Sequence, residues 1–234
     1  LIWLVSVIKR DASIVDIFWG LGFVVLSVVY FILAEDGYSG RKILILALVG
    51  VWGLRLSGHI LARNWGKEED PRYQNFRRRY GKGYWWISFF QVFLLQGAIM
   101  WLISATLLAA HYFDAPDNLT PLDILGAMLW IIGIFFEAVG DWHLKRFKAN
   151  PANAGQVLDS GVWSYTRHPN YFGDAAQWWA YFLIALSSGW GALTIFGPTL
   201  MTYLLVNVSG VAMLERSMKQ KPKYAAYIAR TSAF

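Results

Sequence analysis

The chain has 234 residues, of which 56% are hydrophobic, 17% aromatic and only 15% charged, and its formal net charge is +6. A soluble domain usually carries about a quarter charged residues, so this composition is typical of a membrane protein with aromatic residues at its interfaces. Cysteine is absent, which excludes a disulfide framework, a thiolate nucleophile and a cysteine-based metal site.

Apolar runs recur along the chain, and most approach the roughly 20 residues that a membrane-spanning helix needs. They predict seven spans, at 1–8, 14–34, 43–62, 87–111, 121–143, 171–187 and 190–213. We expect the first to be truncated, because the sequence opens inside an apolar run. We do not interpret this run as a signal peptide, because a basic region and a small-residue cleavage site are missing. The strands of a barrel would alternate in polarity and be about half this length. The sequence therefore predicts an all-α integral membrane protein that forms one domain over 1–234.

The basic residues lie after every second predicted span. They gather after the first span, in an expected loop at 63–82, in the segment 145–167 and in the tail from 216 onward. The other connections, such as EDGYSGRK and FDAPDNLT, have little net positive charge. This distribution favours a multi-pass protein with its basic loops in the cytoplasm, and it argues against nucleic-acid binding.

Two polar features lie in the second and third predicted spans. Asp16 begins the second span, where it can complement the helix dipole or act as a buried acid. Arg55, His59 and Arg63 recur every four residues and form one stripe along the third span. Such a stripe suits an anionic ligand, and an ion-pair network with Asp16 or Glu137 is the alternative.

A third feature follows the fifth predicted span. Glu137, Asp141, Lys145 and Lys148 lie at helical spacing on one face. An acid followed four residues later by a base stabilises a helix, so this pattern can be structural. The two carboxylates can also accept hydrogen bonds from a ribose or an amide.

The stretch SGVWSYTRHPNYFGD, residues 160–174, sets polar and turn-forming residues directly against an apolar run. Pro169 disfavours helix at His168 and suits the first turn of the helix that follows. Exposed N–H groups at that helix start can bind an anion or a nucleotide, and Asn170 and Asp174 add hydrogen-bonding groups. The sequence contains no phosphate-binding glycine loop or Ser-His-Asp pattern, and its scattered histidines predict no metal site.

At these residues the chain resembles a known family along nearly its whole length. GVWSYTRHPNYFGD, preceded by GDWHLKRFKANP and followed by ERSMKQKPKYAAYIARTSAF, is similar to the C-terminal half of the membrane-bound steroid 5α-reductases. DIFWG and RNWGKEEDPRY resemble the bacterial branch of that family. The Arg-His-Pro-x-Tyr-x-Gly element alone is shared with sterol reductases and isoprenylcysteine carboxyl methyltransferases. The resemblance implies a seven-helix bundle in a bacterial inner membrane, with a cytoplasm-facing NADPH cavity and a steroid pocket that opens toward lipid.

The resemblance implies that segment 121–234 mainly binds NADPH. The family's Asn-aromatic-x-Gly-acid motif falls on 170–174, where nicotinamide and ribose contacts are implied. Its helical acid and the basic residue seven positions later fall on Asp141 and Lys148, with lysine where the animal enzymes have arginine. Gln156 replaces a further arginine. The predicted cofactor-binding residues are His59, Arg63, Asn64, Glu137, Asp141, Lys145, Lys148, Tyr165, Arg167, His168, Asn170, Tyr171, Asp174 and Arg216.

The N-terminal half is implied to supply the substrate and catalytic helices. Animal members engage the steroid 3-keto oxygen with a Glu and a Tyr, and by position these are matched by Asp16 and Trp52, with Arg55 three residues later. The indole N–H of Trp52 can donate a hydrogen bond but cannot supply a proton. The chain therefore departs from the family pattern at the residue expected to act as the acid.

The predicted function is NADPH-dependent reduction of the Δ4 double bond of a 3-oxo steroid or a similar enone lipid, by hydride transfer to C5. One alternative is an S-adenosylmethionine-dependent methyltransferase acting on an isoprenylcysteine or another lipid carboxylate. The other is a lipid-binding or transport protein in which the stripe of Arg55, His59 and Arg63 forms the substrate path. We expect membrane lipids as partners and a monomeric protein.

Overall fold

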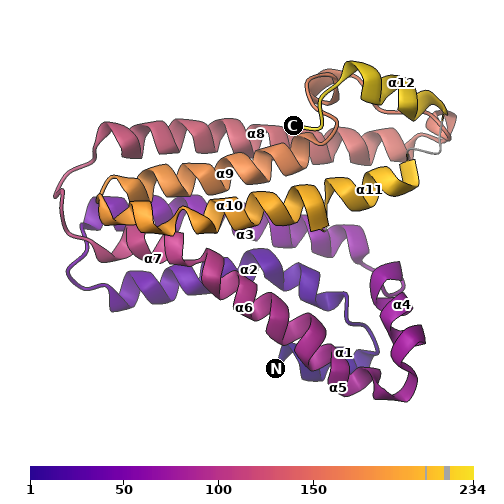
Figure 1. The fold of residues 1–234 in the computed structure, drawn as a ribbon, viewed down its shortest axis with the longest axis horizontal. Helices are drawn as coiled ribbons and strands as arrows, with labels where there is room; N and C mark the ends of the chain where they lie inside the picture. The colour runs from indigo at the N-terminus through magenta and orange to yellow at the C-terminus, as the bar shows by residue number, and fades with distance from the viewer. Residues whose placement is uncertain (209, 219–221) are drawn as a thin grey trace. The chain divides into compact units, whose positions relative to one another are not determined.

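The computed structural model describes residues 1–208, 210–218 and 222–234, and within these ranges it contains helices and no strand (Figure 1). The chain divides into two compact units, Leu1–Asp114 and Ala115–Phe234. The all-α prediction is confirmed for the described residues. That the two units act as a single domain stays a prediction.

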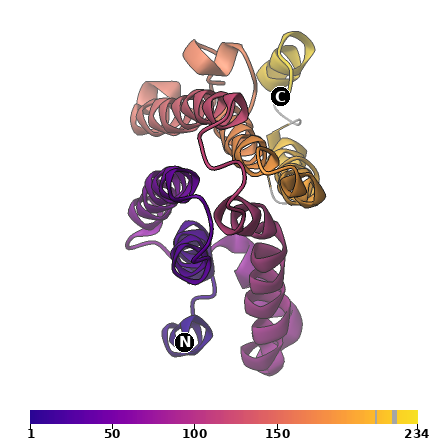
Figure 2. The same cartoon turned by 90° about the vertical axis from the view of Figure 1, so that its left-hand side faces the viewer.

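The first unit is built around the antiparallel pair α2 (Ile14–Leu33) and α3 (Ser39–Asn64), against which α7 packs. Figures 1 and 2 both show α2 and α3 side by side. Two glycines permit this close approach, since a Cβ on Gly20 would lie 2.4 Å from the carbonyl oxygen of Gly53. The other elements are α1 (Ile2–Lys9), α4 (Pro71–Tyr80), η1 (Gly81–Gly83), α5 (Tyr84–Ser88), the π-helical η2 (Phe89–Leu94), α6 (Leu95–Ile103) and α7 (Ala105–Tyr112).

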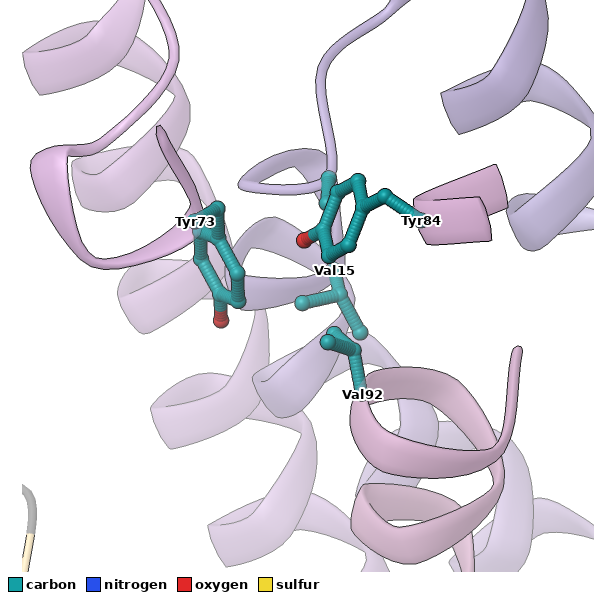
Figure 3. Close-up of a cluster of buried hydrophobic side chains, with 5 residues drawn as sticks. Val15, Tyr73, Tyr84 and Val92 are labelled. Carbon is teal, nitrogen blue, oxygen red and sulfur yellow. The ribbon is translucent and has the colours of Figure 1, made fainter. Parts of the chain in front are cut away.

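The segment 63–82 contains a helix, so the loop predicted there is wrong. Asp70 caps the N-terminus of α4 by accepting a hydrogen bond from the backbone N–H of Arg72 at 2.9 Å, and Pro71 occupies the first helical turn. Helix α4 places Tyr73 in a buried cluster with Val15, Tyr84 and Val92 (Figure 3). The apolar cluster and the cap together fix α4 against the start of α2.

The second unit is built on α8 (Pro121–Ala149) and α9 (Pro169–Leu186), which run side by side (Figures 1 and 2). A capping box of Thr120 and Asp123 starts α8. A Cβ on Gly173 would lie 2.4 Å from the carbonyl oxygen of Gly133, so these two helices also meet at glycine. The other elements are η3 (Pro151–Asn153), η4 (Gly161–Ser164), η5 (Trp190–Thr194), α10 (Phe196–Tyr203), the π-helical η6 (Leu204–Val208), α11 (Val211–Met218) and α12 (Pro222–Arg230).

Five helices in the described part of the chain are long and apolar enough to cross a membrane. They cover Ile14–Leu33, Ser39–Asn64, Pro71–Tyr112, Pro121–Ala149 and Trp190–Arg216. Each matches a predicted span, and the protein is an integral membrane protein. The predicted span at 1–8 corresponds to the eight-residue α1. The predicted span at 171–187 lies in α9, whose buried residues include Asp174 and Gln177 and which is not among the five. The count of seven spans stays a prediction.

Candidate functional site

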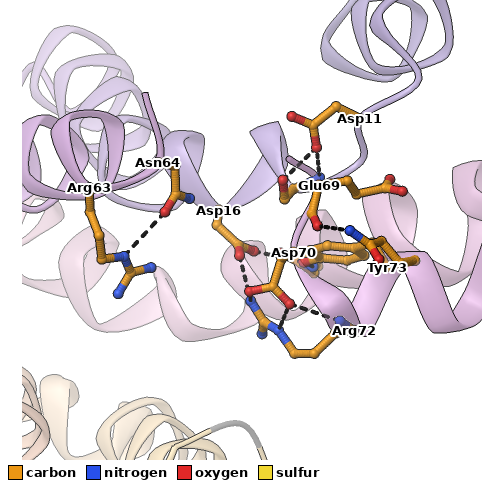
Figure 4. Close-up of polar contacts among 11 residues, drawn as sticks. Asp11, Asp16, Arg63, Asn64, Glu69, Asp70, Arg72 and Tyr73 are labelled. Carbon is orange, nitrogen blue, oxygen red and sulfur yellow. Dashed lines mark hydrogen bonds and ion pairs between the residues drawn. The ribbon is translucent and has the colours of Figure 1, made fainter. Parts of the chain in front are cut away.

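The first unit holds a carboxylate, guanidinium and phenol in direct contact. Asp16, in the first turn of α2, forms an ion pair with Arg72, with 2.6 Å between Oδ2 and Nη2. The hydroxyl of Tyr73 donates a hydrogen bond to the other carboxylate oxygen of Asp16 at 2.7 Å. Figure 4 shows the three side chains meeting between α2 and α4. Asp16, predicted as a catalytic residue, therefore lies in a built polar cluster.

A second carboxylate holds the guanidinium in place. Asp70 accepts a hydrogen bond from Arg72 Nε at 2.9 Å and another from its Nη2 at 3.3 Å. Burial favours the neutral acid at Asp70, but the hydrogen bonds and charge of Arg72 outweigh burial and lower its pKa. Gln96 donates to the Tyr73 oxygen at 3.3 Å. The phenol thus has an acceptor in Asp16 and a donor in Gln96, and its position is fixed.

The cluster is anchored to the chain before α2 through Glu69. This residue accepts a hydrogen bond from the backbone N–H of Ala12 at 2.8 Å and pairs with the Arg77 guanidinium, also at 2.8 Å. Two acidic residues in the expected loop at 63–82, Glu69 and Asp70, therefore form structural ion pairs.

The other predicted residues of the first unit lie along α3. Trp52 is fully buried against α2, with its ring centre 5.8 Å from that of Phe23. Arg55 and His59 are half-buried, and Arg63 is exposed with its Nε 3.3 Å from Oδ1 of Asn64. Burial of Trp52 in the helix pair accounts for its presence without any catalytic role, so its role stays a prediction.

In the second unit, the predicted cofactor residues of α8 and α9 come together. The side-chain amide of Asn170 donates to Oδ1 of Asp141 at 3.2 Å, although 29 residues separate them. One helical turn earlier on α8, Glu137 accepts a hydrogen bond from the amide of Gln177 at 2.6 Å. Asp174 is buried on the same helix as Gln177. The contact between α8 and α9 therefore contains carboxylate and carboxamide groups, which are the types that bind ribose hydroxyls and amides.

Arg167 and His168, which precede α9, are held by an acid on α11. The guanidinium of Arg167 lies 2.7 Å from Glu215, and Nε2 of His168 lies 3.2 Å from the same carboxylate oxygen. Burial lowers the pKa of His168, although the charge of Glu215 acts in the opposite direction. Both residues therefore have internal partners, and their predicted contact with a cofactor stays a prediction.

The C-terminal segment is tied to the loop that precedes α9. The backbone N–H of Arg167 donates to the carbonyl of Ser232 at 2.9 Å, and the hydroxyl of Thr166 donates to the carbonyl of Ala233 at 2.8 Å. Tyr227 on α12 donates to the carbonyl of Trp163. These contacts fix the backbone that leads into Asn170.

The remaining predicted residues are nearer the surface. Tyr171 is half-buried and its ring stacks on His168, with 5.8 Å between ring centres. Four others are exposed side chains, namely Lys145, Lys148, Tyr165 and Arg216. The three exposed cations among them can pair with phosphate, which the internally committed Arg167 cannot do without losing Glu215.

Sequence reasoning missed Arg72 and Tyr73 as members of the site, although the motif RNWGKEEDPRY contains both. It also missed Gln177 and Glu215. A signal for Gln177 exists in the sequence, because a carboxamide three residues after Asp174 on an apolar helix shares its face. No comparable signal pairs Tyr73 with Asp16, since 57 residues separate them.

The profile of a family described as "Protein of unknown function (DUF1295)" matches residues 2–231. The chain belongs to this family. The DUF1295 chain is also similar, at low identity, to named proteins of two chemical kinds, a methyltransferase and sterol or steroid redox enzymes. No solved structure matches it.

The similar proteins share only part of their length with the DUF1295 chain. "Delta(14)-sterol reductase" of Ascobolus immersus is 28% identical over 147 residues, which are 56% of this chain and 32% of that protein. "3-oxo-5-alpha-steroid 4-dehydrogenase 1" of Bos taurus is 32% identical over 78 residues, 32% of this chain and 30% of that protein. "Probable O-methyltransferase ustE" of Ustilaginoidea virens is 28% identical over 115 residues, 49% of this chain and 38% of that protein. The DUF1295 chain thus has weak similarity to both reductases and a methyltransferase, which supports membership of a wider membrane group without specifying its reaction.

Proposed function

We propose that this DUF1295 protein is an NADPH-dependent reductase that saturates the Δ4 double bond of a 3-oxo steroid or of a similar enone lipid. The observation that carries the proposal is the buried phenol of Tyr73, 4% exposed, held 2.7 Å from the carboxylate of Asp16. A phenol can transfer a proton, whereas the indole N–H of Trp52 can only donate a hydrogen bond. The names of the sterol reductase and the steroid dehydrogenase to which the chain is similar support the same reaction class.

The proposed role of Tyr73 follows from where charge develops in this reaction. When hydride adds to the β-carbon of an enone, negative charge grows on the ketone oxygen, and a donor aimed at that oxygen lowers the barrier. A ketone oxygen bound beside Tyr73 would compete with Asp16 for the phenol proton. Asp16 would then orient the phenol, and Arg72 would balance the charge of the carboxylate.

The polar groups of the second unit fit the nicotinamide and ribose part of the cofactor. Asn170 uses its amide nitrogen toward Asp141, and a carboxamide has a second N–H and a carbonyl oxygen for further hydrogen bonds. Lys145, Lys148 and Arg216 are exposed cations suited to phosphate. In this proposal NADPH, when bound, supplies the hydride. The residues of this unit orient the nicotinamide and keep water away from it.

A methyltransferase is the second candidate, favoured by the similarity to the fungal O-methyltransferase. Its usual cofactor, S-adenosylmethionine, also presents ribose hydroxyls, which Asp141 and Glu137 could bind. That cofactor carries no phosphate, so the exposed cations on α8 would have no role in this alternative. A methyl transfer also gives no role to a phenol held by a carboxylate.

The two candidates are separated by the mass of the product. Purified protein in lipid nanodiscs is incubated with progesterone and NADPH, and in a parallel reaction with a lipid carboxylate and S-adenosylmethionine. The proposal expects a gain of two hydrogens in the steroid and no methylation. A methylated product, together with unchanged steroid, would overturn it. The predicted cytoplasmic position of the basic segments is tested separately, by labelling single cysteines in 63–82 from either side of the membrane.

A further inference from the structure

A cavity of about 590 Å³ lies in the first unit, between α1 and the segment from α4 to α5. It is separate from the proposed proton donor, because neither Asp16 nor Tyr73 is among the residues that line it. Its polar and aromatic lining includes Ser6, Arg10, Arg77, Lys82, Trp85 and Ser88.

The lining of the cavity is cationic. It contains Arg10, Arg77 and Lys82 and no acidic residue. Arg77 is neutralised by its bidentate pair with Glu69. In the part of the chain that the structure describes, Arg10 and Lys82 have no carboxylate partner within ion-pair distance. Two positive charges at the cavity are thus left for a ligand.

Arg10 has a backbone conformation that is unfavourable for most residues other than glycine. Its φ of 53° and ψ of 37° place it in the left-handed region at the end of α1, and it is the one non-glycine residue with positive φ in the described ranges. Glycine or asparagine adopts this conformation more easily. An arginine at this position strains the backbone, and its side chain lines the cavity. Strain of this kind motivates the hypothesis that the side chain has a function there.

The surface next to the cavity is apolar and aromatic. Helix α1 exposes Leu4 and Ile8, and the segment after η1 exposes Trp85, Trp86 and Phe90. The indole of Trp3 donates to the carbonyl of Trp85 at 2.9 Å and so joins the two elements. Tryptophan beside basic residues is typical of the zone where a membrane protein meets lipid headgroups.

We propose that this cavity binds the phosphate headgroup of an anionic membrane phospholipid. Arg10 and Lys82 would pair with the phosphate, the hydroxyls of Ser6 and Ser88 offer further hydrogen bonds, and the acyl chains would lie on the exposed apolar residues of α1 and α5. Basic pockets beside spanning helices recognise anionic headgroups in this way. The proposal concerns lipid binding and does not depend on the reductase reaction.

The test compares a cavity variant with a charge-matched control in neutral detergent. The cavity variant carries Arg10→Asn and Lys82→Gln, and asparagine tolerates the left-handed backbone. The control carries Lys67→Gln and Arg78→Gln, two exposed basic residues that do not line the cavity. Binding of phosphatidylglycerol, phosphatidylcholine and free glycerol 3-phosphate is followed by native mass spectrometry and by the lipid-induced rise in melting temperature.

The proposal expects phosphatidylglycerol to bind the wild type and the control equally. It expects roughly 30-fold weaker binding to the cavity variant, about fivefold for each cation removed. If the double variant does not fold, Lys82→Gln alone is expected to give the fivefold loss. Equal binding to the cavity variant and the control would overturn the proposal. So would equal binding of phosphatidylcholine, or saturation by glycerol 3-phosphate at the same concentration, which would identify a soluble phosphate ester as the ligand.

Discussion

Replacement of Tyr73 by Phe is the sharpest test of the proposed proton donor. The substitution removes one oxygen from a side chain that is 4% exposed and leaves its ring in the cluster with Val15 and Val92. It deletes the 2.7 Å hydrogen bond to Asp16 and the 3.3 Å hydrogen bond from Gln96, and it leaves the ion pair between Asp16 and Arg72 intact. The variant therefore isolates the phenol hydroxyl.

Two magnitudes follow from this geometry. A hydrogen bond to a charged group contributes about 1.5–3 kcal/mol, and Asp16 keeps its second partner, so we expect a stability loss near the lower figure, about 1.5 kcal/mol. Removal of one donor to a developing oxyanion lowers turnover by about 10²–10³. Turnover should thus fall far more than a loss of folded protein could explain.

The assay measures steroid reduction and melting temperature for Tyr73→Phe beside Tyr84→Phe. Tyr84 lies in the same buried cluster, but its hydroxyl has no hydrogen-bond partner among the described residues. Tyr84→Phe should therefore keep full turnover and lose no stability, because it removes a buried unpaired hydroxyl. A Tyr73→Phe enzyme that works at the wild-type rate, or a Tyr84→Phe enzyme that is equally impaired, would refute the assignment.

Three further variants test the second unit. Asn170→Ala should weaken NADPH binding by about 1–3 kcal/mol in a fluorescence titration, and unchanged affinity would contradict its cofactor role. Gly173→Ala should destabilise the protein by about 1–3 kcal/mol in thermal unfolding, since its Cβ would lie 2.4 Å from a carbonyl oxygen of α8. Gly58→Ala should not, because a Cβ there would meet no atom within 4 Å among the described residues beyond its own helical neighbours. Because burial lowers the pKa of His168 despite Glu215, the unfolded chain binds a proton that the folded chain does not, and stability should fall as the pH drops below about 6.5. His168→Gln should remove this part of the pH dependence, and an identical pH profile for variant and wild type would contradict it.

Much of the fold could be predicted from the sequence because spanning length is a local property. Long apolar runs identified the helices that became α2, α3 and α8 to within a few residues. The run at 171–187 likewise became α9, Pro169–Leu186, but that helix buries Asp174 and Gln177, and Gln177 donates a hydrogen bond to Glu137 of α8. Its burial is a tertiary property that hydropathy alone does not report.

Only part of the candidate site could be predicted from the sequence. Asp141 and Asn170 were both predicted, and helix packing at glycine brings them within 3.2 Å. The pairing of Asp16 with Tyr73 was not predicted, because α4 is a polar helix without apolar periodicity and was interpreted as part of a loop. Its position depends on a cap at Asp70 and a buried cluster, both of which require the fold.

The most direct measurement of the central claim follows a deuterium atom. Purified protein is given progesterone and NADPH with both C4 hydrogens of the nicotinamide replaced by deuterium, and the steroid product is analysed by mass spectrometry and NMR. We expect one deuterium at C5 of a saturated product and one solvent hydrogen at C4. A saturated product without deuterium, or no change in the steroid while S-adenosylmethionine is consumed, would contradict it.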